Sequence, residues 1–462
     1  MLDYGMTFYF VFILLIVITI ILRKKPILIS ASGLLAVGIG ETASLFQGVQ
    51  VVFRALLSTA TDFLPIILLI GLVVGMTNML KDTGTDWVMS RPFLKIQRAA
   101  LIYWIFGIAL WLLSLFLWPT PAVTLLGAVI LPTLGNTRIN PLGLAIGLCI
   151  FGEGMGLAGD YIIQGAPGLL AKSAGVGVEQ IIRASIPLVF GSGLIAAFIG
   201  FWRFSGLNKQ SPQDKPKDLG LQDKEKQEEK DEKGPGQKIR KENILALLIV
   251  FVFLTTVISL LKSGLRGDSA TAVTGGITLF ILILGTLFWN YKSSLNAFVK
   301  YIQEGMRFSM EVFAPIVVIA GFFILGTQEG NETILLQSGQ GYLEKLSLIL
   351  SGMIPLNLLT CSLIVVFAAV LGAMSGSGFS ALPLVGGLAA ALGHAAGLPV
   401  IPLAVLGQVA AIWTDATIIP WGFPAVVSAV TGTESAIIVR NNVLPWISAL
   451  AWILVWTMCS VK

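Results

Sequence analysis

Long runs of apolar residues with almost no charge dominate this chain of 462 residues. A helix that crosses the hydrocarbon layer of a membrane needs about 20 apolar residues, because only a helix or a closed barrel satisfies its own backbone there. Barrel strands would alternate in hydrophobicity over about ten residues, whereas these runs are unbroken. Only 12% of the residues are charged, against roughly 25% in soluble domains. The sequence therefore predicts an all-α polytopic membrane protein.

About 12 to 14 hydrophobic segments can be read along the chain. The clear spans are 8–22, 63–80, 101–117, 187–202, 244–261, 272–288, 315–326, 358–371 and 443–458. The shorter or interrupted runs are 27–40, 121–134, 142–158, 380–392 and 401–430. The first run has no basic residue before it and is followed by Arg23, Lys24 and Lys25, which predicts a retained anchor whose start lies outside.

Residues 205–241 differ from the rest of the chain, because they hold ten Lys or Arg, eight Asp or Glu and almost no large apolar side chain. Such a segment cannot bury enough surface to offset its ordering entropy, so it is predicted to be a disordered, cytoplasmic linker. It divides the chain into a first transmembrane repeat, 1–204, and a second, 242–462. The net charge of +5 then reflects orientation in the membrane, and no nucleic-acid partner is expected.

The two halves resemble each other in their polar and proline residues as well as in hydrophobicity. Asp160 in the first half and Asp415 in the second lie 255 positions apart, and Pro167 and Pro424 follow them at a separation of 257. The segments 118–124 and 375–380 open matching short apolar runs about 256 positions apart. Duplication with paired interrupted helices is typical of secondary transporters, whose site lies between the repeats.

Each half is therefore predicted to contain a hairpin, at 119–135 and at 375–393, and an interrupted helix. The halves are expected to be inverted repeats if each has an odd number of spans. The segment 119–135 can either cross the membrane fully or form a re-entrant hairpin, and the sequence does not choose between them.

The candidate ion-coupling residues are Asp160 and Asp415, with Glu153 as a further acidic candidate. Four glycines lie among residues 152–159; each costs about 1 kcal/mol in a helix, so we expect the helix to break there. A carboxylate inside a membrane needs a partner, and at a broken helix it can bind a proton or a sodium ion. The alternative is a structural cap that accepts backbone N–H groups.

Hydroxyl and amide side chains cluster near the same interruptions and can ligate sodium or the oxygens of a small anion. Small hydroxyl residues also let membrane helices pack closely, which is the alternative interpretation. Lys172, Arg183 and Arg440 are the nearest basic residues, and they can either attract a carboxylate or lie at helix ends. The predicted substrate-binding residues are Thr120, Thr124, Gln164, Ser375, Ser377, Ser380, Thr414 and Thr417.

Several classes of enzyme are excluded by missing motifs. His394 is the only histidine, so the chain has no H-E-x-x-H site, and no G-x-x-x-x-G-K-[ST] loop for ATP occurs. The three cysteines lie in apolar runs without C-x-x-C spacing, which excludes a disulfide framework and a thiolate metal site. We expect no enzymatic activity and no cofactor, with sodium as the one candidate ion.

The hairpins at 119–135 and 375–393, together with the interruptions around Asp160 and Asp415, resemble the ion-transporter superfamily of secondary carriers, which includes gluconate, lactate and C4-dicarboxylate permeases and some sodium/proton antiporters. The resemblance implies substrate and ions bound between hairpin tips and unwound helices, in a homodimer that works by an elevator movement. The sodium–dicarboxylate branch carries Ser-Asn-Thr at both tips, whereas this chain has Gly135-Asn136-Thr137 after the first hairpin and no counterpart after the second. Gluconate- or lactate-like uptake stays open.

The sequence thus predicts a multi-pass protein of the plasma membrane that moves a small organic anion coupled to protons or sodium. One alternative is a sodium/proton antiporter without an organic substrate. Another is a non-transporting membrane enzyme or scaffold.

Overall fold

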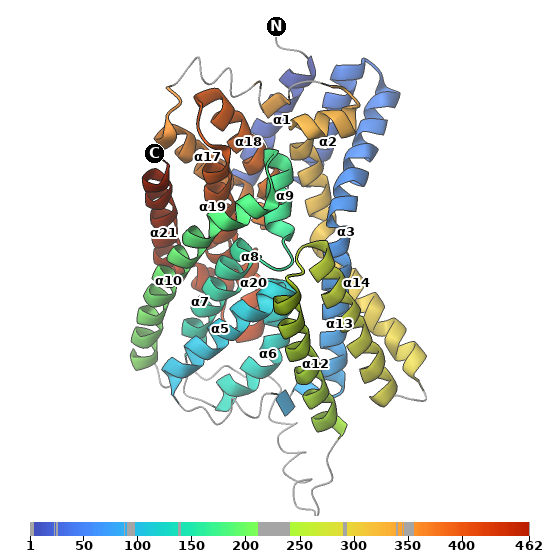
Figure 1. Ribbon diagram of the computed structural model, residues 1–462, viewed down its shortest axis with the longest axis vertical. Helices are drawn as coiled ribbons and strands as arrows, with labels where there is room; N and C mark the ends of the chain where they lie inside the picture. The colour runs from blue at the N-terminus through green and yellow to red at the C-terminus, as the bar shows by residue number, and fades with distance from the viewer. Residues whose placement is uncertain are drawn as a thin grey trace, which may run out of the picture.

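The computed structural model shows a tall bundle of helices, and the part that it describes contains no strand (Figure 1). Ten helices in this part are long and apolar enough to cross a membrane, and three shorter apolar helices accompany them. The prediction of an all-α polytopic membrane protein is confirmed. The described residues are 4–22, 24, 26–86, 88–89, 98–136, 140–210, 241–289, 293–338, 341–343, 345 and 355–461.

The helices of the first half are α1 (Tyr4–Ile21), α2 (Ile27–Thr42), α3 (Leu45–Asp82), α5 (Ala99–Leu117), α6 (Pro119–Asn136), α7 (Pro141–Cys149), the π-helix η1 (Ile150–Met155), α8 (Gly156–Gly159), α9 (Gly165–Ala174) and α10 (Val178–Gln210). Those of the second half are α12 (Lys241–Ser263), α13 (Asp268–Trp289), α14 (Ser294–Leu325), α15 (Gln328–Gly330), η2 (Asn331–Leu335), α17 (Leu358–Ala373), η3 (Phe379–Ala381), α18 (Leu382–Ala396), α19 (Val400–Ile418), α20 (Phe423–Thr431) and α21 (Ser435–Ser460).

Two long helices, α3 and α14, pack against each other along one side of the bundle (Figure 1). Glycines at their crossing let the two backbones approach closely, which is how helices associate in a membrane. Near one end, Lys300 of α14 forms an ion pair with Asp82 of α3 at 3.0 Å. Each helix also contains one proline, Pro65 in α3 and Pro315 in α14.

Two helical hairpins, α5–α6 and α17–α18, lie in the lower and upper parts of Figure 1. The first turns at Trp118, whose φ of 71° ends α5. The second turns through the tip 374–378, so the predicted hairpin 375–393 is this tip and most of its second arm, α18, and not a complete hairpin. The segment 119–135 is therefore one arm of a hairpin and continues as a single helix, because Pro119 and Pro121 fall in its first turn, where a missing N–H group costs nothing.

Each half also contains an interrupted helix. In the first, α7, η1 and α8 are followed by a break at 160–164 and then α9; in the second, α19 is followed by a break at 419–422 and then α20. The expectation of a break at 152–159 was wrong. These glycines stay helical because they are contact points: a side chain at Gly154 would meet the Trp413 ring, and one at Gly156 would meet Ser114.

The ends of the predicted linker differ from the expectation, since α10 continues to Gln210 and α12 begins at Lys241. Residues 211–240 lie outside the described residues, as do 137–139. Each half contains one hairpin followed by one interrupted helix, and the division of the chain into two repeats stays a prediction. That the repeats are inverted stays a prediction.

The cysteines offer a direct test of this packing. Cys149 and Cys361 are buried, whereas Cys459 near the end of α21 is exposed. We expect N-ethylmaleimide to add to one thiol of the folded protein in mild detergent and to all three after denaturation. Intact-mass spectrometry checks this, and two or more adducts on the native chain would contradict the packing of α7 and α17.

Candidate functional site

The tips of the two hairpins meet inside the bundle. Trp118 at the first tip packs edge-on against Phe379 of η3 just after the second tip, with ring centroids 5.3 Å apart. Phe63 of α3 and Phe313 of α14 also contact the Phe379 ring, at 5.3 Å and 6.4 Å. This aromatic cluster joins hairpins from both halves to the two long helices.

The second break is bound to the second hairpin tip by hydrogen bonds. The backbone N–H of Gly378 donates to Asp415 Oδ2 at 2.9 Å, and the indole N–H of Trp421 donates to the carbonyl of Met374 at 3.1 Å. Glycine is required at 378, because a Cβ atom there would lie 2.8 Å from the carbonyl oxygen of Ala411. The tip therefore rests directly on the backbone of α19.

The first break is organised by Asp160. Its two carboxylate oxygens accept the backbone N–H groups of Gln164 at 3.1 Å and Ala166 at 2.9 Å, so it caps the start of α9. The side chain is 2% exposed. Gln164 adopts a left-handed backbone, with φ of 61°. Both oxygens of Asp160 are thus occupied by the protein itself, which fits the capping alternative.

Asp415 differs, because its carboxyl group meets a second acid. Glu153 lies in the π-helix η1, which packs against α19, the helix that carries Asp415, and the two buried carboxyl groups are close enough to interact electrostatically. They are 7% and 4% exposed, and Asp415 Oδ1 has no donor. No Lys or Arg among the described residues forms an ion pair with either acid. Two neighbouring buried carboxylates repel each other unless a proton or another cation lies between them.

Further buried polar groups lie on α7, α19 and α21, and no sequence motif points to them. Cys149 is buried at the end of α7 and lies in the electrostatic field of both acids. Gln408 donates to the carbonyl of Ala158 at 3.1 Å, while its Oε1 and the Asn442 amide are buried without partners. The sequence pattern that could have pointed to these residues is a single polar residue within an otherwise apolar run. Unpaired buried polar atoms indicate a place for water or an ion.

The predicted hydroxyl residues lie in three places. Ser375, Ser377 and Ser380 lie at the second hairpin tip, where Ser375 and Ser380 Oγ atoms are 2.9 Å apart. Thr124 bonds to the carbonyl of Thr120 at 2.8 Å at the start of α6. Thr414 and Thr417 are fully buried, and both bond to carbonyls of their own helix. The hairpin hydroxyls are thus at the meeting point of the interruptions; that any of them binds substrate stays a prediction.

The basic residues predicted near the interruptions lie toward the surface. Lys172 forms an ion pair with Asp62 of α3 at 3.0 Å, and the exposed Arg183 pairs with Glu179 one turn away. Arg440 is exposed. The described residues hold no group of three or more His, Cys, Asp or Glu side chains arranged for a metal ion.

Known proteins resemble this chain along nearly its whole length. No protein-family model matches it. YhfA of Bacillus subtilis (strain 168), described as an uncharacterized membrane protein, is 33% identical over 447 residues, which is 95% of this chain and 94% of YhfA.

Two solved structures also resemble it. The YdaH transporter of Alcanivorax borkumensis superposes with a TM-score of 0.54 over 89% of each chain at 14% identity, so the similarity concerns the fold. MtrF of Neisseria gonorrhoeae, which belongs to a class of antimetabolite efflux pumps, gives a TM-score of 0.48 over 99% of this chain and 95% of its own at 16% identity.

Proposed function

This chain belongs to the family of the membrane protein YhfA, and we propose that it is a secondary active transporter of the plasma membrane. It moves a small organic anion together with protons or sodium ions. The fold supports this proposal, since a solved transporter shares it. The meeting of two hairpin tips and two interrupted helices in one place is the second support, because transporter sites form at such discontinuities.

The acid pair of Glu153 and Asp415 carries the proposal. An acid buried in a membrane protein is costly and marks an ion or proton pathway by default. Here the two acids come from the two halves of the chain and have no basic partner among the described residues. One proton or sodium ion between them relieves their repulsion.

Movement of the second hairpin follows from this arrangement. Asp415 holds the tip through the N–H group of Gly378, so a change in the charge of the pair changes the strength of that bond. Binding of the coupling ion and position of the hairpin are then linked, and linkage of two binding events is what a symporter requires. In this scheme Asp160 acts as the cap that fixes α9.

Reconstituted protein tests the proposal. We expect proteoliposomes to accumulate at least one of lactate, gluconate, succinate and benzoate, each radiolabelled, when a pH or a sodium gradient is imposed, and to lose the accumulation when ionophores collapse it. Protein-free liposomes are the control. A sodium-driven pH change inside vesicles without any accumulation of these acids would instead favour the antiporter, and no response to either gradient would contradict secondary transport.

A further inference from the structure

The outward side of α14 carries a row of charged residues that alternate in sign. Successive members are three or four residues apart, so they share one side of the helix, away from the buried Tyr301, Gly305 and Ser309. All of them are exposed, and this part of α14 lies at the outer edge of the bundle (Figure 1). The row extends about 16 Å along the helix axis. The members of this α14 charge row are Lys300, Glu304, Arg307 and Glu311.

The α14 charge row lies beside the apolar stretch 63–80 of α3. A Cβ atom at Gly75 would lie 2.7 Å from the carbonyl oxygen of Tyr301, and one at Gly71 would lie 3.3 Å from the hydroxyl oxygen of Ser309. An apolar stretch of this length is what crosses the hydrocarbon layer. The row is therefore level with the hydrocarbon layer and not with the water beyond it.

The neighbouring helix α13 shows what surrounds the protein at this level. Residues 275–285 of α13 lie beside residues 69–79 of α3, and here Phe280 is 52% exposed and Ile283 is 38% exposed. Such apolar side chains on an outward side face acyl chains. Charged side chains in the same position would be costly, so the outward side of α14 needs a different environment.

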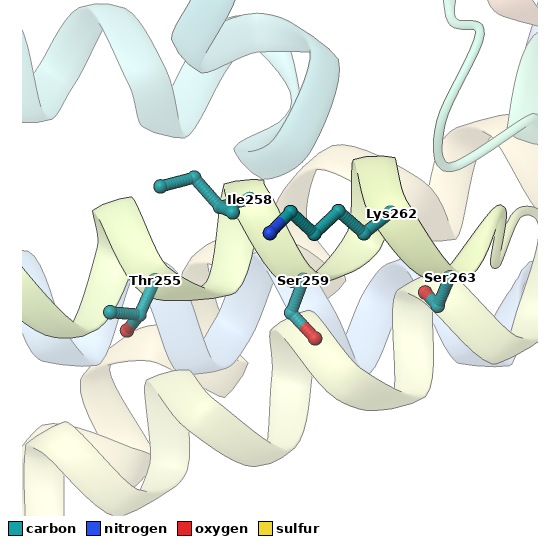
Figure 2. Close-up of a pocket in the computed structure, with 5 residues that line it drawn as sticks. All are labelled: Thr255, Ile258, Ser259, Lys262 and Ser263. Carbon is teal, nitrogen blue, oxygen red and sulfur yellow. The ribbon is translucent and has the colours of Figure 1, made fainter.

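Polar residues on the outward side of α12 are accommodated within the helix. Figure 2 shows Thr255, Ser259, Lys262 and Ser263 on this side. The hydroxyl groups of Thr255 and Ser263 donate to carbonyls of their own helix. Lys262 lies in the last turn, from which a long side chain can reach the membrane surface. These residues are compatible with contact to lipid.

The turn that follows α12 is bound by the same chain. Arg266 donates to the carbonyl of Tyr161 at 2.7 Å, and the N–H of Gly267 donates to the carbonyl of Ile162 at 2.9 Å. The turn 264–267 is thus docked onto the first break. The cation in this turn has an acceptor within the chain.

The α14 charge row is only partly paired within the chain. Lys300 forms its ion pair with Asp82 at 3.0 Å, and a side-chain amide of α3 donates to Glu304 at 2.9 Å. Arg307 and Glu311 lie further from that end of α3. Neither forms an ion pair in the part of the chain that the structure describes. The half of the row that lies deepest is therefore the half without an opposite charge.

Another protein surface has to separate this row from lipid, because a water-filled space at this depth also needs a wall on its lipid side. A second copy of this chain fits, since the alternation of sign makes the row complementary to itself. Two-fold dimers are the commonest homo-oligomers. Around a two-fold axis along the membrane normal, Lys300 and Arg307 of each copy lie about one helical turn from Glu304 and Glu311 of the other.

We propose that the α14 charge row is the contact surface between two copies of this chain in the membrane. The contact gives Arg307 and Glu311 opposite charges on the other copy and removes both from lipid. It does not depend on the proposed transport function.

Crosslinking tests the contact. The full chain carries Gln303→Cys, an exposed position beside the row, in a Cys459→Ser background, and it is reconstituted in phosphatidylcholine liposomes at a low protein-to-lipid ratio. A short bis-maleimide is expected to give about tenfold more covalent dimer than with Phe280→Cys, because a contact raises the effective concentration of the two thiols. Phe280→Cys is the matched control, since it is exposed at the same level on α13.

Charge reversal tests the pairing. Arg307→Glu leaves acids in the deep half of the row and Glu311→Arg leaves bases there, so each variant is expected to self-associate about tenfold less than the unmodified chain. A mixture of the two variants, each with its own affinity tag, is expected to copurify as a mixed dimer. Arg183→Glu, which reverses an exposed charge on α10, is the control and is expected to change nothing.

A Gln303→Cys thiol that forms no covalent dimer would overturn the proposal. Labelling of that thiol by a membrane-impermeant maleimide would then indicate water at this surface, and no labelling would indicate lipid. Crosslinking without copurification of the mixture would also overturn the proposal, because the contact would not depend on the charges. If size-exclusion chromatography shows that a reversed variant does not fold, the crosslinking result decides alone. None of these results bears on transport.

Discussion

Asp415→Asn is expected to lower gradient-driven solute accumulation strongly while the protein stays folded. The asparagine oxygen can still accept the N–H of Gly378, which Asp415 now accepts at 2.9 Å. The asparagine side chain can no longer gain or lose a charge beside Glu153. The ion gradient therefore no longer changes the strength of the hydrogen bond that holds the second hairpin. Coupling free energies between sites are about 1–3 kcal/mol, which predicts a fall in the accumulation ratio of roughly 5- to 150-fold.

Substitution of Glu153, the other acid of the pair, provides a second test. Glu153→Gln is expected to have the same effect, and the double variant is expected to be no worse than either single one, because the two acids act as one unit. Glu179→Gln is the control, since it removes an exposed acid whose surface ion pair contributes little. Additive losses in the double variant, or full activity of Asp415→Asn in uptake assays, would show that the acids do not form a coupling pair.

Gly305→Ala is expected to destabilise the protein by about 3 kcal/mol, near the upper end of the usual cost of overpacking. A Cβ atom at Gly305 of α14 would overlap the carbonyl oxygen of Gly71 in α3 and lie 2.9 Å from the N atom of Gly75. These neighbours are backbone atoms and cannot rotate away, so the two long helices would have to separate.

A second glycine provides the comparison. Gly276→Ala in α13 introduces the same methyl group at a position with no atom within 4 Å, and it is expected to be neutral or to stabilise the helix by up to about 1 kcal/mol. Thermal unfolding of both variants in the same detergent measures the difference. Equal unfolding temperatures would mean that α3 and α14 do not cross at Gly71 and Gly305.

The residues of the candidate site were only partly predictable. Asp160 and Asp415 occupy equivalent positions in the repeat, and the sequence favoured them as a pair. In the structure each accepts backbone N–H groups near a break, but the acid that meets Asp415 is Glu153. Two residues at equivalent positions of a repeat do not have to be in contact. Contact depends on how the helices pack, and only packing places two charged side chains next to each other.

The glycines at 152–159 illustrate the same limit. Helix propensity alone predicts a break there. The segment is nevertheless helical, because its glycines leave room for the side chains of Trp413 and Ser114 to pack against it. The docking of the turn 264–267 onto the first break could not be predicted from the sequence, because the carbonyl groups that accept its hydrogen bonds belong to a distant segment. Tertiary packing overrides propensity where a close approach of helices needs the missing side chain.

By itself the sequence determined that this chain is an all-helical membrane protein and roughly where its long helices are interrupted, whereas the turns of the two hairpins at Trp118 and at 374–378 come from the structure. The features that the sequence determined follow from hydrophobic runs, prolines and duplication, which act over a few tens of residues. Only the tertiary structure decided that both hairpin tips meet, that Asp415 pairs with Glu153 and that α12 docks onto the first break. These contacts join segments more than a hundred residues apart, and the free energy that selects them comes from packing and from partners for buried polar groups.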